Sequence, residues 1–137
     1  MRHHISHLFM AEDLMYLKRG DRISAATAVV GTALGVRPIL SINGQGKLAV
    51  IDKIRGQKHA LQELLTRWQN TRDPIQNRIV IAHTDAPECA EALACAVRKY
   101  NPQADITCTM LNPIIGAHTG PGMAALIYFG DRTAICT

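Results

Sequence analysis

The chain has 137 residues, which is the usual size of one domain. Its 47% hydrophobic residues exclude a disordered chain, and no stretch approaches the roughly 18 consecutive apolar residues of a membrane span. Fifteen basic and eleven acidic residues give a net charge of +4, and only 4% of residues are aromatic. Such a small charge excess and so few stacking rings argue against a nucleic-acid partner. We therefore expect a soluble globular domain with no membrane span.

Residues 1–10 contain three histidines, His3, His4 and His7. Their spacing matches neither a helical His-x-x-x-His pair nor a Cys/His finger, so the sequence predicts no metal site. We expect residues 1–10 to be a partly disordered leader and residues 11–137 to form the domain. The four cysteines form no Cys-x-x-Cys pair, which favours a reducing, cytoplasmic location.

The first half of the domain is predicted to hold two helices and a hairpin. A helix over about residues 11–18 ends at a C-terminal glycine signature. A second helix, 25–34, is rich in small residues and apolar on nearly all sides, so it should be buried or line a cavity. Strands 38–42 and 47–51 flank an Asn-Gly turn that favours an antiparallel hairpin.

The second half alternates helices and strands. The expected elements are an amphipathic helix 58–70, strand 79–83, helix 87–100, strand 106–110, a glycine-rich turn 116–122 and strand 125–129. A strand–helix–strand unit is normally parallel and right-handed. The whole pattern predicts an α/β fold with a mixed β-sheet of about five to six strands covered by helices.

Positive charge is concentrated in residues 47–58, where four basic residues and one acidic residue give +3. Within this stretch Arg55 stands just before a predicted helix, and its guanidinium suits a carboxylate or phosphate. A solvated basic surface is an equally good interpretation of the same residues.

A stronger candidate is the segment 116–122, in which three glycines and a proline surround His118. Its backbone N–H groups could converge on an oxyanion, and the imidazole can donate to or pair with an acid oxygen near neutral pH. The alternative is a histidine that merely completes a turn. The segment lacks the Gly-Lys-Ser/Thr ending of a Walker A motif.

Four motifs follow one another along the chain. The first is residues 14–24, with Leu17-Lys18-Arg19-Gly20-Asp21-Arg22-Ile23-Ser24. The other three are Arg37-Pro38-Ile39-Leu40, Lys53-Ile54-Arg55-Gly56 and His118-Thr119-Gly120-Pro121-Gly122. Taken together they resemble the DegV family, a bacterial family of two-domain fatty-acid-binding proteins. Residues 14–24 resemble its Leu-x-x-Leu…Gly-Gly-Arg-Ile-Ser signature, with Asp21 in place of the second glycine.

The resemblance implies a role for each of several residues. The lipid head group would lie near His118, Arg55, Thr119 and Gly120, and Arg22 would brace the domain junction. The acyl tail would run along Ile23, Ala26, Val30, Leu34 and Ile115. It also implies that this chain is the C-terminal half only, without the N-terminal DegV domain and its threonine and serine carboxylate ligands.

The function that follows is binding of a long-chain fatty acid. No other cofactor is expected. The resemblance implies that the acid is presented to a separate fatty-acid kinase A subunit for acyl-phosphate formation in phospholipid metabolism, the chain being non-catalytic alone. Two alternatives stay open. One is a small phosphometabolite-binding enzyme that uses the 116–122 loop, and the other is a ligand-free interaction domain that forms a homodimer through an exposed apolar patch.

Overall fold

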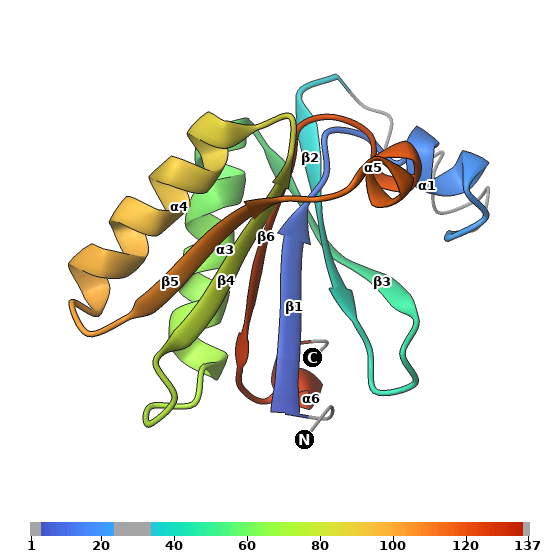
Figure 1. Cartoon of the computed structure of the whole chain (residues 1–137). Coiled ribbons are helices and arrows are strands. Elements are labelled where there is room, and N and C mark those ends of the chain that lie inside the picture. Colours follow the sequence, from blue (N-terminus) through green and yellow to red (C-terminus); the bar gives the residue numbers. More distant parts are fainter. Residues whose placement is uncertain (1–3, 24–33, 136–137) are drawn as a thin grey trace.

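The computed structural model describes residues 4–23 and 34–135, and Figure 1 shows their arrangement. A single mixed sheet has the strand order β3-β2-β1-β6-β4-β5. The strands are β1 (Ile5–Met10), β2 (Val36–Ile42), β3 (Leu48–Arg55), β4 (Arg78–Thr84), β5 (Asp105–Met110) and β6 (Met123–Phe129). The helices of the described part are α1 (Met15–Arg19), α3 (Gln57–Thr71), α4 (Pro87–Tyr100), α5 (Pro113–Thr119) and α6 (Arg132–Ile135).

The predicted α/β fold with a mixed sheet is confirmed. The hairpin forms from β2 and β3, which pair antiparallel with a register shift between Ile39 and Leu40. β4 and β5 are parallel neighbours joined through α4, as the strand–helix–strand pattern predicted. The predicted helix 25–34 lies almost entirely outside the described residues.

The expectation of a leader over residues 1–10 is wrong for residues 5–10. They form β1, which pairs antiparallel with β2 on one side and with β6 on the other. Leu8 and Met10 are fully buried against the helices. β1 is therefore a central strand of the sheet. Its six residues show no polar–apolar alternation that would have marked them as a strand.

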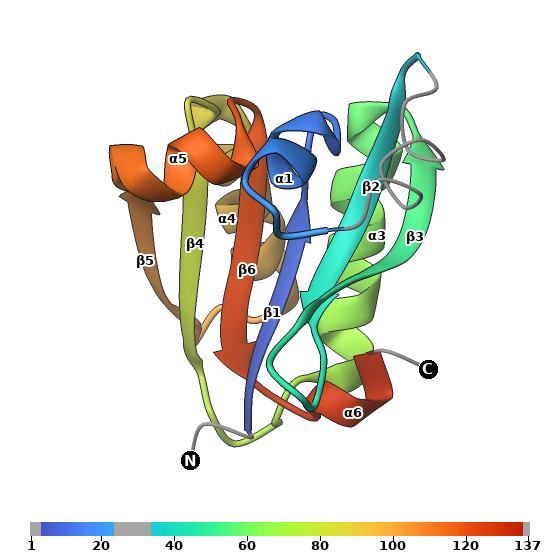
Figure 2. The same ribbon diagram turned by 90° about the vertical axis from the view of Figure 1, so that its right-hand side faces the viewer.

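The main core lies between the sheet and the pair α3 and α4, which cover the same face (Figure 2). α4 buries one stripe of small and aliphatic residues, and α3 buries Leu64 and Trp68. At the ends of these helices the Trp68 and Tyr100 rings meet edge to face, with centroids 5.4 Å apart. The Arg72 guanidinium lies 5.5 Å from both ring centroids, which adds cation–π attraction.

Tyr128 of β6 makes the stability of the fold depend on pH. Burial raises the pKa of its phenol to about 12, although the hydroxyl is 2.6 Å from Thr71 Oγ1. A phenol with a raised pKa in the folded state stabilises the fold below pH 10, and that contribution is lost as the pH rises towards 12. We expect the free energy of unfolding to fall by roughly 2–3 kcal/mol across this window. Urea titrations at successive pH values test this, and the Tyr128→Phe variant should show a smaller fall.

Candidate functional site

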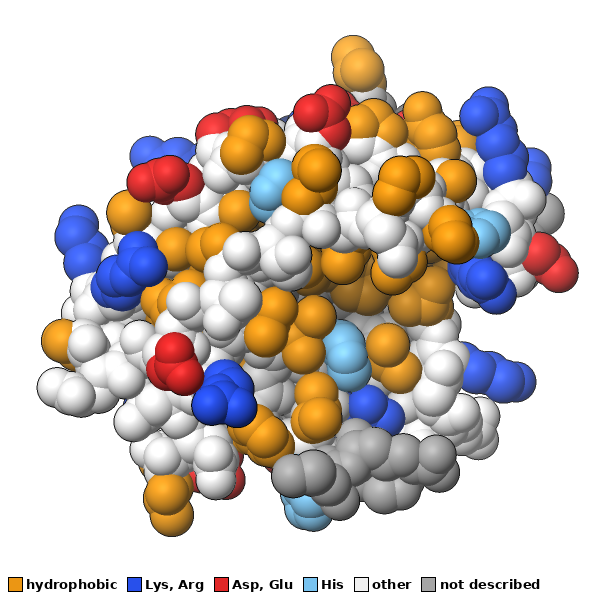
Figure 3. Space-filling view, in the orientation of Figure 1, with side chains coloured by type: hydrophobic (Ala, Val, Ile, Leu, Met, Phe, Trp, Pro, Cys, Tyr) orange, Lys and Arg blue, Asp and Glu red, His pale blue; other side chains and the backbone are white. Residues whose placement is uncertain are grey.

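Among the described residues, α1 and α5 cover the opposite face of the sheet at its upper end (Figures 1 and 2). Beneath these helices lies a cavity of about 340 Å³, here called the apolar groove. Figure 3 shows it as a hollow floored by hydrophobic side chains. Ten of its fourteen lining residues are apolar. The lining consists of His7, Phe9, Leu17, Arg22, Ile42, Leu48, Ala82, Leu111, Ile115, His118, Thr119, Met123, Ala125 and Ile127.

The groove follows from side-chain alternation in the central strands. Successive residues of a strand point to opposite faces, so Leu8 and Leu126 enter the main core while Phe9 and Ala125 face the groove. Ala82 and Ala125 supply small side chains to the floor. The space that larger residues would fill is therefore left open between the sheet and the two helices.

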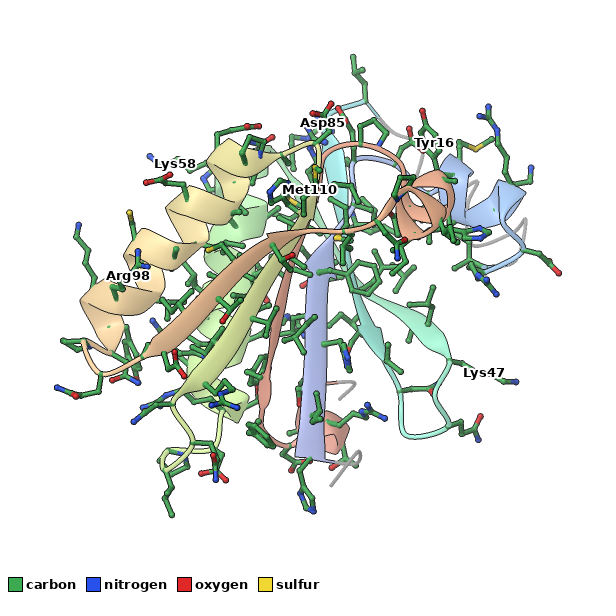
Figure 4. The ribbon with its side chains drawn as sticks, viewed as in Figure 1. Tyr16, Lys47, Lys58, Asp85, Arg98 and Met110 are labelled. Atoms are coloured by element: carbon green, nitrogen blue, oxygen red, sulfur yellow. The ribbon has the colours of Figure 1, made fainter. Side chains whose placement is uncertain are left out.

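The α1–α5 contact sets the position of His118 at the groove. A Cβ on Gly20, the residue after α1, would collide with His118 Nδ1, so the imidazole packs directly on the backbone of Gly20. Tyr16 is a residue of α1 (Figure 4), and its ring packs on the turn after α5, where it would collide with a Cβ on Gly120. Gly120 also has a φ of 75°, which favours glycine. Two glycines thus allow the helices to approach.

Thr84, at the end of β4, holds the turn after α5. Its hydroxyl donates to the Gly120 carbonyl oxygen at 2.5 Å and accepts from the Met123 N–H at 3.2 Å. The Gly122 N–H donates to the Thr84 carbonyl oxygen at 2.7 Å. From the sequence, His83-Thr84-Asp85 is only a weak site candidate at the end of the predicted strand, and the role of the Thr84 hydroxyl in holding this turn is visible only in the structure.

The expected oxyanion cradle at 116–122 does not form. Residues 113–119 are helical, and the N–H groups of Gly116 and Gly120 donate to the carbonyl oxygens of Asn112 and Gly116. The Gly122 N–H is used by Thr84. These donors are occupied within the chain, so the segment contributes the side chains of His118 and Thr119 to the site and not an anion-binding backbone.

Asp21 adopts the left-handed conformation, with a φ of 55°. The family signature places a glycine here, and aspartate is one of the residues that tolerate this conformation. The turn is thus kept, and no ion pair joins Asp21 to Arg22 within the described residues. Arg22 lies exposed at the groove, on the same side as His118.

The structure brings together only some of the predicted site residues. His118, Thr119, Ile115 and Arg22 line the groove. Gly120 is buried beneath Tyr16 and is not among the residues that line the groove. Ala26 and Val30 lie outside the described residues.

Three other predictions differ from the structure. Leu34 is 93% exposed and is not among the groove residues. Ile23 packs beside the groove, in a neighbouring hollow with Arg22 and Lys47. Arg55 is exposed at the end of the edge strand β3 and is not among the groove residues.

The charge of residues 47–58 is also spread in space. Lys47 lies at the tip of the hairpin and Lys58 at the start of α3, on opposite sides of the molecule (Figure 4). Asp52 is 2.9 Å from the Arg67 guanidinium, which also bonds Glu63 at 2.7 Å. The excess charge of this stretch therefore does not form one local site.

A substitution at Gly20 tests the positioning of His118. Gly20→Ala keeps an allowed backbone, with φ −81°, but forces the imidazole to move. We expect the His118 ring signals to shift in an NMR spectrum while the free energy of unfolding changes by about 1 kcal/mol or less. Gly44→Ala is the matched control, because a Cβ there meets nothing within 4 Å. Unchanged His118 signals in Gly20→Ala would contradict this packing.

The fold and this groove define the chain as an α/β domain with an apolar groove on one face of its sheet. Comparison with known proteins gives its family: the family described as "Uncharacterised protein, DegV family" matches residues 1–131. The chain belongs to the DegV family. A DegV domain-containing protein from Clostridium perfringens is 39% identical over 131 residues, covering 93% of this chain and 44% of that protein.

Solved structures share the fold. A fatty acid binding DegV family protein from Streptococcus agalactiae is 31% identical with a TM-score of 0.78, covering 90% of this chain and 44% of that one. A Streptococcus pneumoniae fatty acid kinase B3 protein, solved with linoleic acid, is 23% identical with a TM-score of 0.84, covering 93% and 45%. The chain thus spans about half the length of these relatives. Among the described helices, none is long and apolar enough to cross a membrane.

Proposed function

We propose that this chain forms one half of a fatty-acid carrier and binds the acyl tail in the apolar groove. The groove carries the proposal, because a cavity with ten apolar lining residues suits a hydrocarbon chain. Each buried methylene contributes about 0.8 kcal/mol. The Streptococcus agalactiae relative, described as fatty acid binding, supports the same ligand class.

The carboxylate is proposed to lie at the α1–α5 end, beside His118 and Arg22. Both side chains line the groove there, and together they offer a hydrogen-bond donor and a permanent positive charge. The Thr119 hydroxyl donates to the Ile115 carbonyl oxygen at 3.1 Å, so it is already engaged within α5. Arg22 thereby takes the role that the sequence suggested for Arg55.

Arg55 is proposed to act on a partner and not on the bound tail. It is exposed on β3, outside the groove, where it can meet a fatty-acid kinase A subunit that phosphorylates the carboxylate with its own ATP. The chain would then be non-catalytic alone and need no cofactor. The other half of the carrier, an N-terminal DegV domain, would complete the site, since the relatives are about twice as long.

A phosphometabolite site at 116–122 is less well supported. Its backbone donors are bonded within the chain, and the adjoining cavity is mainly apolar. A polar ligand would lose hydrogen bonds to water there without recovering them.

Three matched variants test the proposal by fluorescence titration with oleate, in the chain joined to a DegV N-terminal half. Arg22→Gln and His118→Gln should each weaken binding about tenfold, the loss of one charged or strong hydrogen bond. Arg55→Gln should leave affinity within about twofold and lower acyl-phosphate formation by the kinase. Failure of the unsubstituted protein to bind oleate would refute the function, and equal losses in all three variants would refute the assignment of the head group.

A further inference from the structure

His7 is an unusual residue to find in the floor of the groove. Three of the polar lining residues, Arg22, His118 and Thr119, come from the α1–α5 end. His7 comes from β1, where it pairs with Ile127 of β6. His7 stands three residues before Met10, the last residue of β1. It therefore lies about 10 Å along the strand from the end of β1 that Met10 forms. Among the described residues that line the groove, His7 is the only polar one that a strand contributes.

The polar atoms of His7 are incompletely satisfied. Its Nδ1 is inaccessible to solvent and has no hydrogen-bond partner among the described residues. Burial, followed by the charge of Arg132 on α6, lowers the pKa of the imidazole. The ring is therefore neutral at pH 7, with one nitrogen that donates and one that accepts. Because Nδ1 has no accessible surface as placed, a ligand in the groove can bond to it only after the ring turns over.

Nearby side chains do not supply that partner. The Arg132 Nε donates to the Ile5 carbonyl oxygen at 3.1 Å, and the strand neighbour of His7 is the apolar Ile127. A half-turn about Cβ–Cγ exchanges Nδ1 with Cδ2 and Nε2 with Cε1, so whichever edge of the imidazole lines the groove can present a nitrogen to it. A saturated tail passing His7 would cover this group without bonding to it.

We propose that His7 selects acyl chains that carry a hydroxyl group near the middle of the chain. This inference rests on the proposed function, since it takes the carboxylate to lie at the α1–α5 end. The hydroxyl both donates and accepts, so it pairs with a neutral imidazole in either tautomer. The ligand class is a mid-chain hydroxylated long-chain carboxylic acid, and His7 is the specificity-determining residue.

Competition binding with three named acids tests the proposal, in the chain joined to a DegV N-terminal half. We expect 12-hydroxyoctadecanoic acid to bind about tenfold more tightly than octadecanoic acid, the worth of one hydrogen bond in an apolar site. The control ligand, 2-hydroxyoctadecanoic acid, has its hydroxyl at the head and should gain nothing from His7.

Two variants complete the test. His7→Phe, an apolar ring of similar size, should remove the preference for the 12-hydroxy acid, and His7→Gln, which keeps a donor and an acceptor, should retain part of it. Equal affinities for the 12-hydroxy and saturated acids in the unsubstituted protein would overturn the inference alone. A preference that persists in His7→Phe would do the same, whereas binding of none of the three acids would overturn the proposed function.

Discussion

Replacing Ala125 by phenylalanine is expected to abolish most of the acyl affinity while the fold survives. Ala125 lies in the floor of the groove, and a ring there occupies space that the tail would use. Exclusion of three or four methylenes removes about 3 kcal/mol of binding free energy, or roughly a hundredfold in affinity. Titration with oleate measures the loss, and thermal unfolding checks the fold.

Ala124→Phe is the matched control for that variant. Ala124 is the preceding residue of β6, fully buried on the opposite face, in the main core. A ring has no room there, so overpacking should cost about 1–3 kcal/mol of stability. If Ala125→Phe binds oleate as tightly as the unsubstituted protein, the tail does not run over this part of the sheet.

The second large effect concerns β1. Leu8→Ala should lower the free energy of unfolding by about 2–5 kcal/mol, because it leaves a cavity in the main core. Leu8 is fully buried between the sheet and the helices, whereas Leu34, the matched leucine, is 93% exposed. Leu34→Ala should change stability by no more than about 0.5 kcal/mol.

Urea unfolding of both variants measures these changes. A leader over residues 1–10 would make Leu8→Ala as mild as Leu34→Ala. The large difference expected here therefore tests the central place of β1 directly.

The regular elements of the second half were predictable from sequence because local signals were strong. α4 begins at a proline and shows one clear apolar stripe, so Pro87–Tyr100 was predicted with its observed bounds. β1 was missed because His7 interrupts a short strand that follows two further histidines, and because its partners β2 and β6 are distant in sequence. Pairing of this kind is not encoded in a short window.

The candidate site was predicted only in part for the same reason. His118 stood out through the glycines beside it, Thr119 belongs to the last family motif, and Ile115 followed only from the family resemblance. The groove floor depends on which residues of β1 and β6 face outward, and that requires β1 to be known. Residues such as His7 and Ile127 therefore became visible only in the structure. The order of the motifs along the chain also did not reveal that Arg55 lies outside the groove.

The most direct test of the acyl-binding groove is a methyl NMR titration with oleate. Ile127, Leu48 and Ile115 line the groove, whereas Ile79 lies in the main core on the opposite face. We expect the methyl signals of the three groove residues to shift and to show cross-peaks to the acyl chain, and those of Ile79 to stay in place. Saturation with oleate that leaves the groove methyl signals unchanged would contradict the proposed site.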